Sequence, residues 1–402
     1  MQYTTDDVME LVEQEDVRFI QLAFTDCRGR QKSIAIMPSE LPRAFKSGIS
    51  FDASAIAGFE SEVRSDLFLH PIAATLTALP WHAVQGKVVR MFCDIRYPDS
   101  TPYEKDSRAI LSAAVNEARA AGIQLFFGPE YEFYLFETDE KGRPTKTPLD
   151  TAGYMDVAPE DKGEVIRREI CFTLQEMGIS PESSHHEEGP GQNEIDFRYS
   201  DALSAADNAL NFMTVVKAAA MQNGLCADFS PKPLPGASGN GLHINISLRC
   251  ADGIDRTPQF MAGILAHIRE ITVFLNPCRD SYQRLGRNKA PKYVTWSREN
   301  RSQLIRIPAA SGEYARMELR SPDPTANPYL AYALLIRAGL DGIQHNIPLP
   351  LPTDLNLFHA DAAETAQLQS LPLSLDEAAM LARESKFVAS VLPEAMRACL
   401  LA

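Results

Sequence analysis

The first hundred residues carry one helical pattern followed by several strand patterns. In 6–15, four apolar residues are spaced for one face of a helix. Apolar and polar positions then alternate through 17–26, the sequence CRGR at 27–30 predicts a turn, and the alternation resumes over 31–37. We therefore expect a β-hairpin, followed by another apolar strand over 88–95.

The pattern changes near residue 100. A stretch rich in proline and charge at 98–108 leads into a predicted helix over 106–121. This shift in composition predicts a boundary between a small β-rich domain, 1–100, and a larger domain, 101–402. The larger part mixes strands, predicted at 123–137, 193–199, 242–248 and 315–321, with helices at 161–177, 201–224, 258–276 and 325–342 and an apolar helical end at 374–402. Such a mixture predicts an α+β fold with a large sheet.

Composition narrows the class of protein. Hydrophobic residues make up 45% of the 402 positions and charged residues 23%, which is typical of a globular protein with two or three domains. Acidic residues outnumber basic residues by 53 to 39, so the formal net charge is −14, which argues against nucleic acid or an anionic membrane as a partner. No apolar run reaches the roughly 18 residues that a membrane span needs.

The cysteines and the first residues of the chain bear on its location. The seven cysteines are scattered without a CxxC pair, which favours reduced thiols over a disulfide framework or a zinc site. The opening sequence MQYTTDDVMELVEQEDV is acidic where a signal peptide would be basic and then apolar. Both features predict a cytoplasmic protein.

Two glutamates lie inside the otherwise apolar strand FFGPEYEFYLF. Because side chains alternate along a strand, Glu130 and Glu132 face one side. Tyr131, Phe133 and Leu135 then face the core. Two carboxylates on one face repel each other and lose hydration, and a nearby cation would relieve both effects. A solvated edge strand is the alternative interpretation.

The segment HHEEGPGQNEIDF at 185–197 adds two more acidic candidates. Glu187 and Glu194 stand on either side of a Gly-Pro-Gly turn, and a loop that bends there brings both to one ion. His185 and His186 would either join them as ligands or orient them. On this segment alone, a solvated acidic loop is the better explanation.

The segment GASGNGLHINISL at 236–248 places a loop of small residues before a strand. His243, Asn245 and Ser247 share one face of that strand. Glycines permit close approach of the backbone to a ligand, and imidazole suits a transition-like ion or Mn²⁺. A structural histidine is the alternative, and the polar neighbours on the same face make the two interpretations about equal.

Positive charge gathers in RENRSQLIRIP and ARMELRSPDP. In the second segment, Arg316, Glu318 and Arg320 share one face of a predicted strand. A structural ladder of ion pairs fits this pattern, but arginine also holds carboxylates and phosphates with paired hydrogen bonds. Hard oxygen ligands for divalent ions beside arginines predict a phosphoryl-transfer site. From these residues a kinase, a ligase and a dinuclear phosphoesterase all stay open.

Several blocks of the sequence, read in order, resemble a known family. GPEYEFYLF, HHEEGPGQNEI, SPKPLPGASGNGLHINISL, NRSQLIRIP and RMELRSPDPTANPYLAYALLIRAGLDGI resemble the signature blocks of the glutamine synthetase family, bacterial type I in particular. FDASAIAGF at 51–59 is similar to another block of that family. The resemblance implies a small N-terminal β-grasp domain and a large catalytic domain with a curved antiparallel sheet and helices. It also implies a ring-shaped homo-oligomer, a hexamer or dodecamer, with active sites between subunits.

The resemblance assigns a role to each matching residue. For two divalent cations, Mg²⁺ or Mn²⁺, it implies one ligand set at Glu132, Glu187 and Glu194 and a second at Glu130, His243 and Glu318. It implies that ATP contacts Glu182, Asn245, Ser247, Arg301, Arg306 and Arg316. The other substrates would contact Tyr154, Gly239, Arg284, Arg301 and Arg320. Asp52, Arg301 and Arg320 would act in catalysis, with Asp52 helping to deprotonate the incoming ammonium.

The chain departs from the family pattern on the amine side. In the flap segment RLGRNKAP, the position where the family has a glutamate is Lys289. A positive charge there repels ammonium by roughly 1–4 kcal/mol at about 4 Å for intermediate dielectrics. Either Lys289 points away, or a neighbour such as Glu299 takes the role of the missing glutamate, or the acceptor is not ammonium. Phe358 stands where some members have a tyrosine that is adenylylated.

The residues and the resemblance together predict an ATP-dependent carboxylate–amine ligase. It would phosphorylate the γ-carboxylate of glutamate or a similar acid and pass the acyl group to ammonia or another amine, giving an amide, ADP and phosphate. Its partners would be small-molecule acid and amine substrates and further copies of the chain. Two alternatives stay open: a relative without ligase activity that serves in assembly or regulation, and a metal-dependent kinase that stops at a phosphorylated acid or guanidine.

Overall fold

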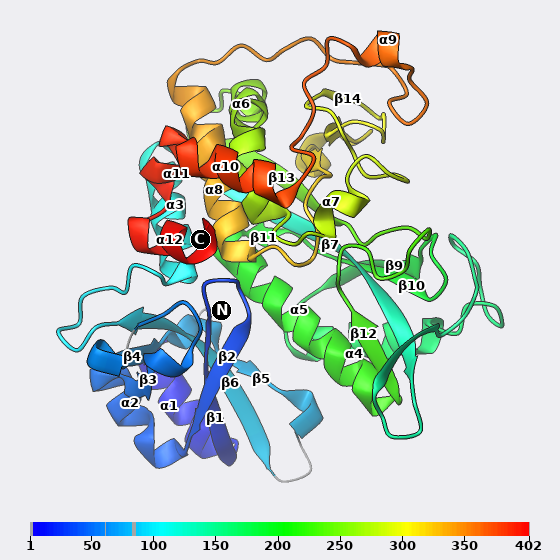
Figure 1. Ribbon diagram of the computed structural model, residues 1–402. Coiled ribbons are helices and arrows are strands. Elements are labelled where there is room, and N and C mark those ends of the chain that lie inside the picture. Colours follow the sequence, from blue (N-terminus) through cyan, green and yellow to red (C-terminus); the bar gives the residue numbers. More distant parts are fainter. Residues whose placement is uncertain (1–2, 61, 83–85, 402) are drawn as a thin grey trace.

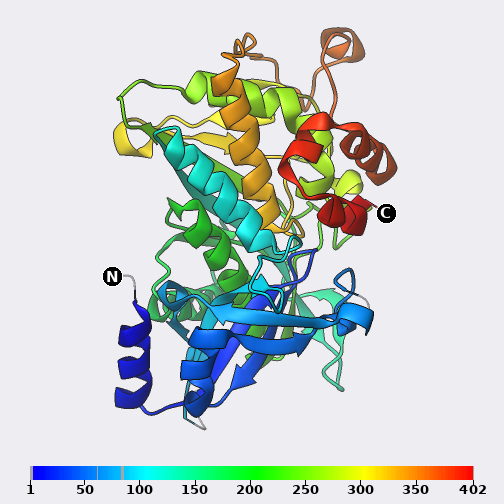
Figure 2. The ribbon, with the colours of Figure 1, turned by 90° about the vertical axis from the view of Figure 1, so that its left-hand side faces the viewer.

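The computed structural model describes residues 3–60, 62–82 and 86–401, which form two parts built on two separate sheets (Figure 1, Figure 2). The N-terminal part, blue in Figure 1, lies below the larger part. The segment 97–106 joins them, and the predicted boundary at residue 100 lies within this segment. In the part of the chain that is described, no helix combines the length and the apolar character that crossing a membrane requires.

The N-terminal part is a mixed sheet with two short helices. Its elements are α1 (Thr5–Gln14), β1 (Val17–Thr25), β2 (Gln31–Ile36), α2 (Leu41–Ser47), β3 (Ile49–Asp52), β4 (Asp66–Pro71), β5 (Thr77–Ala78) and β6 (Lys87–Arg96). The strand order is β2-β1-β6-β4-β3, with β5 paired to β6. Strands β1 and β6 run parallel, and the other pairs are antiparallel. The predicted hairpin is β1 and β2, which pair from Ile20 opposite Ile36 to Thr25 opposite Gln31.

The larger part is organised around the sixteen-residue strand β7 (Ile123–Thr138). The other strands are β8 (Pro144–Pro148), β9 (Pro181–His186), β10 (Gln192–Phe197), β11 (Ser200–Asp201), β12 (Leu225–Asp228), β13 (Leu242–Cys250), β14 (Trp296–Arg298), β15 (Ile305–Ile307) and β16 (Met317–Leu319). Their order is β14-β15-β16-β13-β7-β10-β9, with β8, β11 and β12 also paired to β7. The pairs are antiparallel except β14 with β15, so the sheet is mixed.

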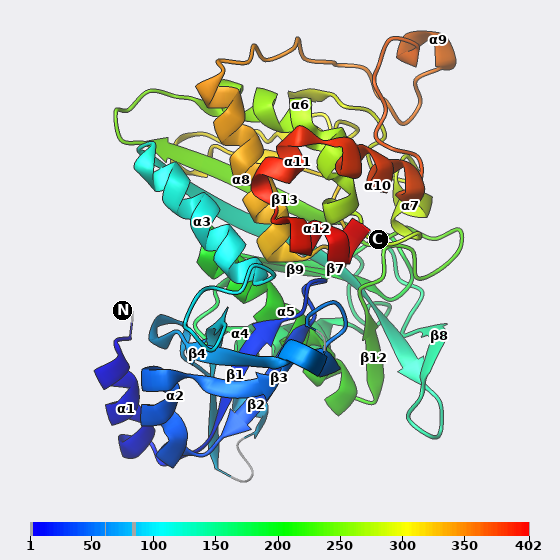
Figure 3. The same ribbon diagram turned by 60° about the vertical axis from the view of Figure 1, so that its left-hand side comes forward.

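Long helices pack against this sheet and against each other (Figure 3). The helices are α3 (Ser107–Ala120), α4 (Glu164–Glu176), α5 (Ala202–Gln222), α6 (Thr257–Leu275), α7 (Ser281–Arg284), α8 (Pro328–Gln344), α9 (Ala362–Thr365), α10 (Leu375–Glu384), α11 (Lys386–Val391) and α12 (Glu394–Leu401). Short 3₁₀ helices are η1 (Pro38–Glu40), η2 (Ala53–Ala55), η3 (Glu62–Arg64), η4 (Ala73–Thr75), η5 (Pro80–His82) and η6 (Gly312–Tyr314). Helices α6 and α8 lie so close that a Cβ atom at Gly263 would be 2.1 Å from the carbonyl oxygen of Ala338.

The alternation predicted for β7 is confirmed. Tyr131, Phe133 and Leu135 are fully buried, and the Tyr131 ring packs 5.4 Å from the ring of Phe212 on α5. The side chains of Glu130 and Glu132 therefore point to the opposite face of the sheet, away from this core. The predicted α+β fold is also confirmed, but the large sheet, which the resemblance implied to be antiparallel, is mixed because β14 and β15 run parallel.

Several predicted elements have different limits in the structure, among them the strand at 315–321 and the helix at 325–342. The predicted strand 315–321 is reduced to β16, so Arg316 and Arg320 flank the strand. The predicted helix 325–342 begins instead at Pro328, because the side chain of Asn327 accepts a hydrogen bond from the backbone of Tyr329 at 3.1 Å and caps the helix there.

Candidate active site

The acidic face of β7 meets its neighbouring strands at a cavity of about 520 Å³. The sheet register places His243 of β13 opposite Glu130 and Glu194 of β10 opposite Glu132. Side chains directly opposite on adjacent strands lie within contact distance, so the strand order gathers candidate ligands from distant segments. Glu187, in the turn between β9 and β10, lines the same cavity.

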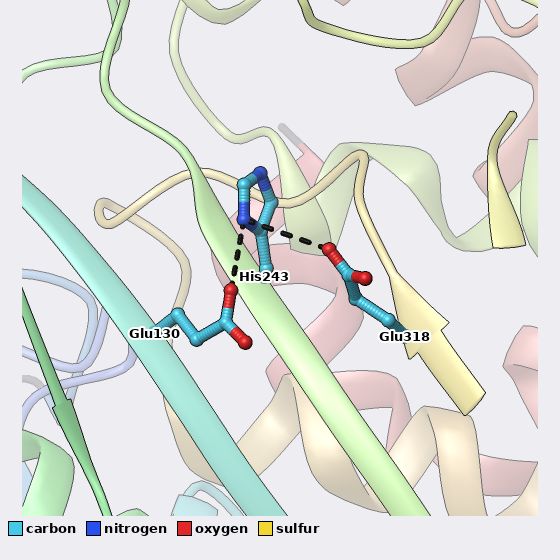
Figure 4. A group of neighbouring side chains, drawn as sticks. All are labelled: Glu130, His243 and Glu318. Carbon is cyan, nitrogen blue, oxygen red and sulfur yellow. Dashed lines mark hydrogen bonds and ion pairs between the residues drawn. The ribbon is translucent and has the colours of Figure 1, made fainter. Parts of the chain in front are cut away.

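Glu130, His243 and Glu318 form one group of candidate ligands (Figure 4). The Nδ1 atom of His243 lies 3.2 Å from an oxygen of Glu130 and 3.8 Å from an oxygen of Glu318. Burial opposes the ionisation of Glu130, but the hydrogen bond and charge of His243 and the amide of Asn245 lower the pKa of Glu130 to about 2. The group therefore presents an ionised carboxylate beside one imidazole.

A second group lies beside the first, in which Glu194 clusters both with Glu132 and His243 and with His185 and Glu187. The Nε2 atom of His185 lies 3.2 Å from an oxygen of Glu187 and 3.9 Å from an oxygen of Glu194. The Nε2 atom of His243 lies 3.9 Å from an oxygen of Glu132. Burial and neighbouring carboxylates raise the pKa of Glu194 well above its usual range, and burial together with Glu187 raises the pKa of Glu132. These carboxylates repel one another because they share a space with little water.

Asp196 belongs to the same acidic cluster, although sequence analysis did not single it out. Its carboxylate lies within 4.8 Å of ligand atoms of Glu130 and Glu194. Burial and the charge of Glu130 raise the pKa of Asp196 to about 6. A signal was present in the sequence, because Asp196 follows Glu194 by two positions on one strand and therefore shares its face.

The residues of the two groups fit divalent cations that prefer oxygen ligands. They offer carboxylates from several strands and a single imidazole, the donor set that suits Mg²⁺ or Mn²⁺. One oxygen of Asp196 is buried and has no hydrogen-bond partner among the described residues. Burial and mutual repulsion raise the pKa values of Glu132 and Glu194, and a bound cation would relieve that repulsion.

The two adjacent histidines have different surroundings. His185 faces the glutamates, as described above, whereas His186 is fully buried behind the turn. The Nε2 atom of His186 lies 2.9 Å from a carboxylate oxygen of Asp150, and the same oxygen accepts a hydrogen bond from the backbone of Gly191 at 3.0 Å. Asp150 thus fixes the turn that carries Glu187. No local pattern marks Asp150, because its histidine partner is 36 residues away.

The arginines are placed by β15 and by the residues that flank β16. Arg306 of β15 and Arg320 both pair with the buried carboxylate of Glu318. Arg316 does not join this ladder, because it donates a hydrogen bond from Nε to the amide oxygen of Asn245 at 2.8 Å. The predicted ladder of Arg316, Glu318 and Arg320 is therefore only partly formed within its own segment, and Arg306 completes it from another strand.

Three further candidates line the first cavity, Arg284 from the end of α7 and Gly239 and Arg301 from loops. Arg284 is buried and donates to the carbonyl oxygen of Ser321 at 2.8 Å, while Arg301 is exposed at the cavity mouth. At Gly239 a Cβ atom would lie 2.4 Å from the carbonyl oxygen of Pro231, so glycine is required where the backbone borders the cavity.

A second cavity of about 350 Å³ shares Glu130 and Arg316 with the first. Its lining includes three further candidate ATP contacts, Glu182, Asn245 and Ser247, and a pair of aromatic residues, Phe126 and Tyr199. The candidates Arg301 and Arg306 line the first cavity instead. The rings meet edge to face at 5.8 Å. The aromatic pair was missed in the sequence because its members come from different segments that β7 and the end of β10 bring together.

The flap residue Lys289 lies in the wall of the first cavity. Its Nζ atom is 2.5 Å from a carboxylate oxygen of Glu188 and 5.3 Å from the centre of the Tyr154 ring. Lys289 therefore does not point away from the site. Glu299, the suggested substitute, is absent from the lining that the described residues form.

Asp52 lies outside both cavities formed by the described residues. It is exposed at the end of β3, where its side chain accepts hydrogen bonds from the backbone and the hydroxyl of Ser54 at 2.9 and 2.6 Å. These bonds lower the pKa of Asp52. A single chain thus gathers the candidate metal, ATP and acid contacts but leaves Asp52 apart.

Comparison with protein-family models gives two matches that follow one another along the chain. Residues 16–98 match the model described as the glutamine synthetase beta-grasp domain, and residues 104–399 match the glutamine synthetase catalytic domain. A glutamine synthetase of Clostridium saccharobutylicum is 43% identical over 405 residues, and one of Methanosarcina mazei is 44% identical over 407 residues. Each alignment covers 97% of this chain and 91% of the relative.

Solved structures give the same picture of the fold. The structure of a GmaS/ADP complex has a TM-score of 0.89 and 28% identity, and the match covers 98% of this chain and 94% of the other. A cryo-EM structure of Plasmodium falciparum glutamine synthetase has a TM-score of 0.87 and 23% identity, with coverage of 100% and 96%. The second likeness shows the shared fold alone.

Proposed function

This chain belongs to the glutamine synthetase family, and from that premise we propose how its cavity carries out the reaction. The enzyme is a glutamine synthetase-type ligase that uses ATP to join glutamate to an amine. Our assignment of individual residues depends above all on one observation. Carboxylates from three strands and a turn converge with His243 beside a cavity that is also bordered by arginines.

Two divalent cations are proposed to bind this cluster. Glu132, Glu187 and Glu194 would hold one ion, and the group of Glu130, His243 and Glu318 would hold the other. Support comes from the ligand distances, the oxygen-rich donor set and the mutual repulsion of the carboxylates. Mg²⁺ or Mn²⁺ in these positions would neutralise phosphate charge.

The arginines and the second cavity are assigned to ATP and the transferred phosphoryl group. Glu182, Asn245 and Ser247 border the second cavity, whose aromatic rings suit a nucleotide base. Arg306 and Arg316 would hold the phosphates where the two cavities share lining residues. There the γ-phosphoryl group passes from ATP to the γ-carboxylate of glutamate, which gives an acyl phosphate and ADP.

The amino acid and its acyl phosphate are assigned to the first cavity. Arg284 and the backbone at Gly239 would hold glutamate, and Arg301 and Arg320 would stabilise negative charge that develops during transfer. An amine then attacks the acyl carbon, phosphate leaves, and the amide is formed. Tyr154 borders the side from which the amine would enter.

Asp52 is proposed to serve the amine side from a neighbouring copy of the chain. Its distance from the cavities of its own chain supports this arrangement, as does membership of a family that is typically oligomeric. A ring of six subunits, or two such rings, would place Asp52 of one subunit at the site of the next, where it would help to remove a proton from ammonium. We also propose a cytoplasmic location, which the seven free thiols support.

The proposed function is tested by measuring ADP release and trapping the intermediate. Purified enzyme with ATP, glutamate and Mg²⁺ or Mn²⁺ should release ADP, and hydroxylamine should trap the acyl phosphate as a hydroxamate. Glu132→Ala should abolish both signals, whereas Glu137→Ala, an exposed glutamate on the same strand, should leave them unchanged. ADP release without hydroxamate would favour a kinase that phosphorylates another group, and ATP binding without turnover would favour a silent relative.

A further inference from the structure

The amine side of the first cavity is already occupied by a cation of the protein itself. The Lys289 ammonium group forms an ion pair with Glu188 at 2.5 Å and lies over the ring of Tyr154. An acidic partner and an aromatic face are the two features by which proteins bind alkylammonium ions. Lys289 therefore uses the contacts that a positively charged amine substrate would need.

The pair is anchored on both sides. On the Glu188 side, the second carboxylate oxygen accepts a hydrogen bond from the hydroxyl of Ser238 at 3.3 Å. On the aromatic side, the ring of Tyr154 meets the ring of His185 edge to face at 5.4 Å. The pair is half-exposed, with 54% of the Lys289 side chain and 33% of the Glu188 side chain accessible, so that both reach the entering substrate.

The balance of charged side chains on the cavity wall depends on Lys289. Among the described residues, seven arginine and lysine side chains and six carboxylates line the first cavity. A carboxylate at position 289 would reverse that balance. Arg287, on the same flap, also lines the cavity and has no ion pair or hydrogen bond from its side chain within the described ranges. The flap thus presents one paired and one unpaired cation to the entering amine.

We propose that Lys289 determines the class of amine that this enzyme accepts: amines without net positive charge, such as the zwitterion of an amino acid, in preference to ammonium and alkylammonium ions. The proposal rests on the ligase function above and deepens it. Glu188 is unavailable to a cationic amine because Lys289 holds it, while Arg287 is available to a substrate carboxylate. Lys289 acts as a specificity-determining residue and takes no part in phosphoryl transfer.

The experiment compares two small acceptors that differ in charge. Ammonium is a cation at neutral pH, whereas hydroxylamine of similar size is largely uncharged. The measured quantity is the ratio of kcat/KM for ammonium to kcat/KM for hydroxylamine, with glutamate and ATP saturating. Lys289→Gln releases Glu188 and should raise this ratio about fivefold or more, and Glu188→Gln should lower it by a similar factor. Lys292→Gln, which removes a positive charge outside the cavity lining, should leave the ratio unchanged.

The two variants are expected to shift the ratio in opposite directions, which distinguishes a charge effect from loosening of the flap. If Lys289 only held the flap in place, both variants would shift the ratio in the same direction or not at all, and the proposal would be overturned. A second pair of acceptors tests the zwitterion directly: the wild-type enzyme should use glycine better than glycinamide, which is similar in size but carries a net positive charge. Equal use, the reverse preference or use of neither overturns that assignment. Absence of any hydroxamate in the wild-type enzyme would instead overturn the ligase function itself.

Discussion

Asn245 offers a sharp test of how the two cavities are connected. Its side-chain amide donates a hydrogen bond to a carboxylate oxygen of Glu130 at 2.7 Å and to the carbonyl of Gly128 at 3.1 Å. Its oxygen accepts from Arg316 at 2.8 Å. Asn245 therefore links a proposed metal ligand to a proposed phosphate contact. Replacing it by leucine keeps the approximate size of the side chain and removes all three hydrogen bonds, two of which join charged groups.

The expected loss follows from the charges of the two partners. A hydrogen bond to a charged group contributes about 1.5–3 kcal/mol. Both Glu130 and Arg316 are partly exposed, so the lower figure applies to each link. Together they amount to about 3 kcal/mol, and every 1.4 kcal/mol corresponds to a tenfold change. Asn245→Leu is therefore expected to lower kcat/KM for ATP by about a hundredfold.

The assay is steady-state ADP release with ATP varied at saturating glutamate, and then with glutamate varied at saturating ATP. The KM for ATP should rise much more than the KM for glutamate, because Arg284 and Gly239 are left intact. Asn116→Leu, on the exposed face of α3, is the matched control and should behave like wild type. A loss in kcat/KM for ATP below about threefold, or equal rises in the two KM values, would refute the assigned role of Asn245.

Three further predictions concern the stability of the fold. Glu318→Gln leaves two guanidinium groups without their shared buried carboxylate and should lower the free energy of unfolding by about 3–5 kcal/mol in urea denaturation; a loss below about 1 kcal/mol would contradict this. Gly263→Ala forces a Cβ atom into the backbone of α8 and should lower the melting temperature by about 5 °C or more in calorimetry, whereas an unchanged value would show that the helices separate freely. Burial opposes the charge on His267, but hydrogen bonds to Glu270 and Asp341 raise its pKa above the usual 6.5, so the charged ring stabilises the fold below that value and the benefit is lost as pH rises through the raised pKa. His267→Gln should therefore lower the melting temperature more at about pH 6 than at about pH 9, and equal losses would count against the argument.

Much of the catalytic sheet was predictable because the relevant signal is local. The two-residue period of β7 puts Glu130 and Glu132 on one face and Tyr131 and Phe133 on the other, whatever the neighbouring strands are. The same rule would have identified Asp196 from Glu194. Helix limits were less predictable where a single cap decided them, as at Asn327.

The resemblance to a family predicted which scattered residues share one site, but it gave no contact between them. Register and strand order decided that His243 lies opposite Glu130 and that Arg306 reaches Glu318 from another strand. Such pairs depend on strand order and register, which are fixed only when segments far apart in the chain pack into one sheet.

The amino-acid sequence alone was sufficient for the fold class, the acidic faces of the strands and the unusual lysine of the flap, because alternation and residue type are properties of short segments. The contacts of Lys289 with Glu188 and Tyr154, and the position of Asp52 outside the cavities of its own chain, became known from the packed structure. A loop carries no period from which the direction of a side chain can be calculated, and its partners are fixed only when the surrounding elements have packed.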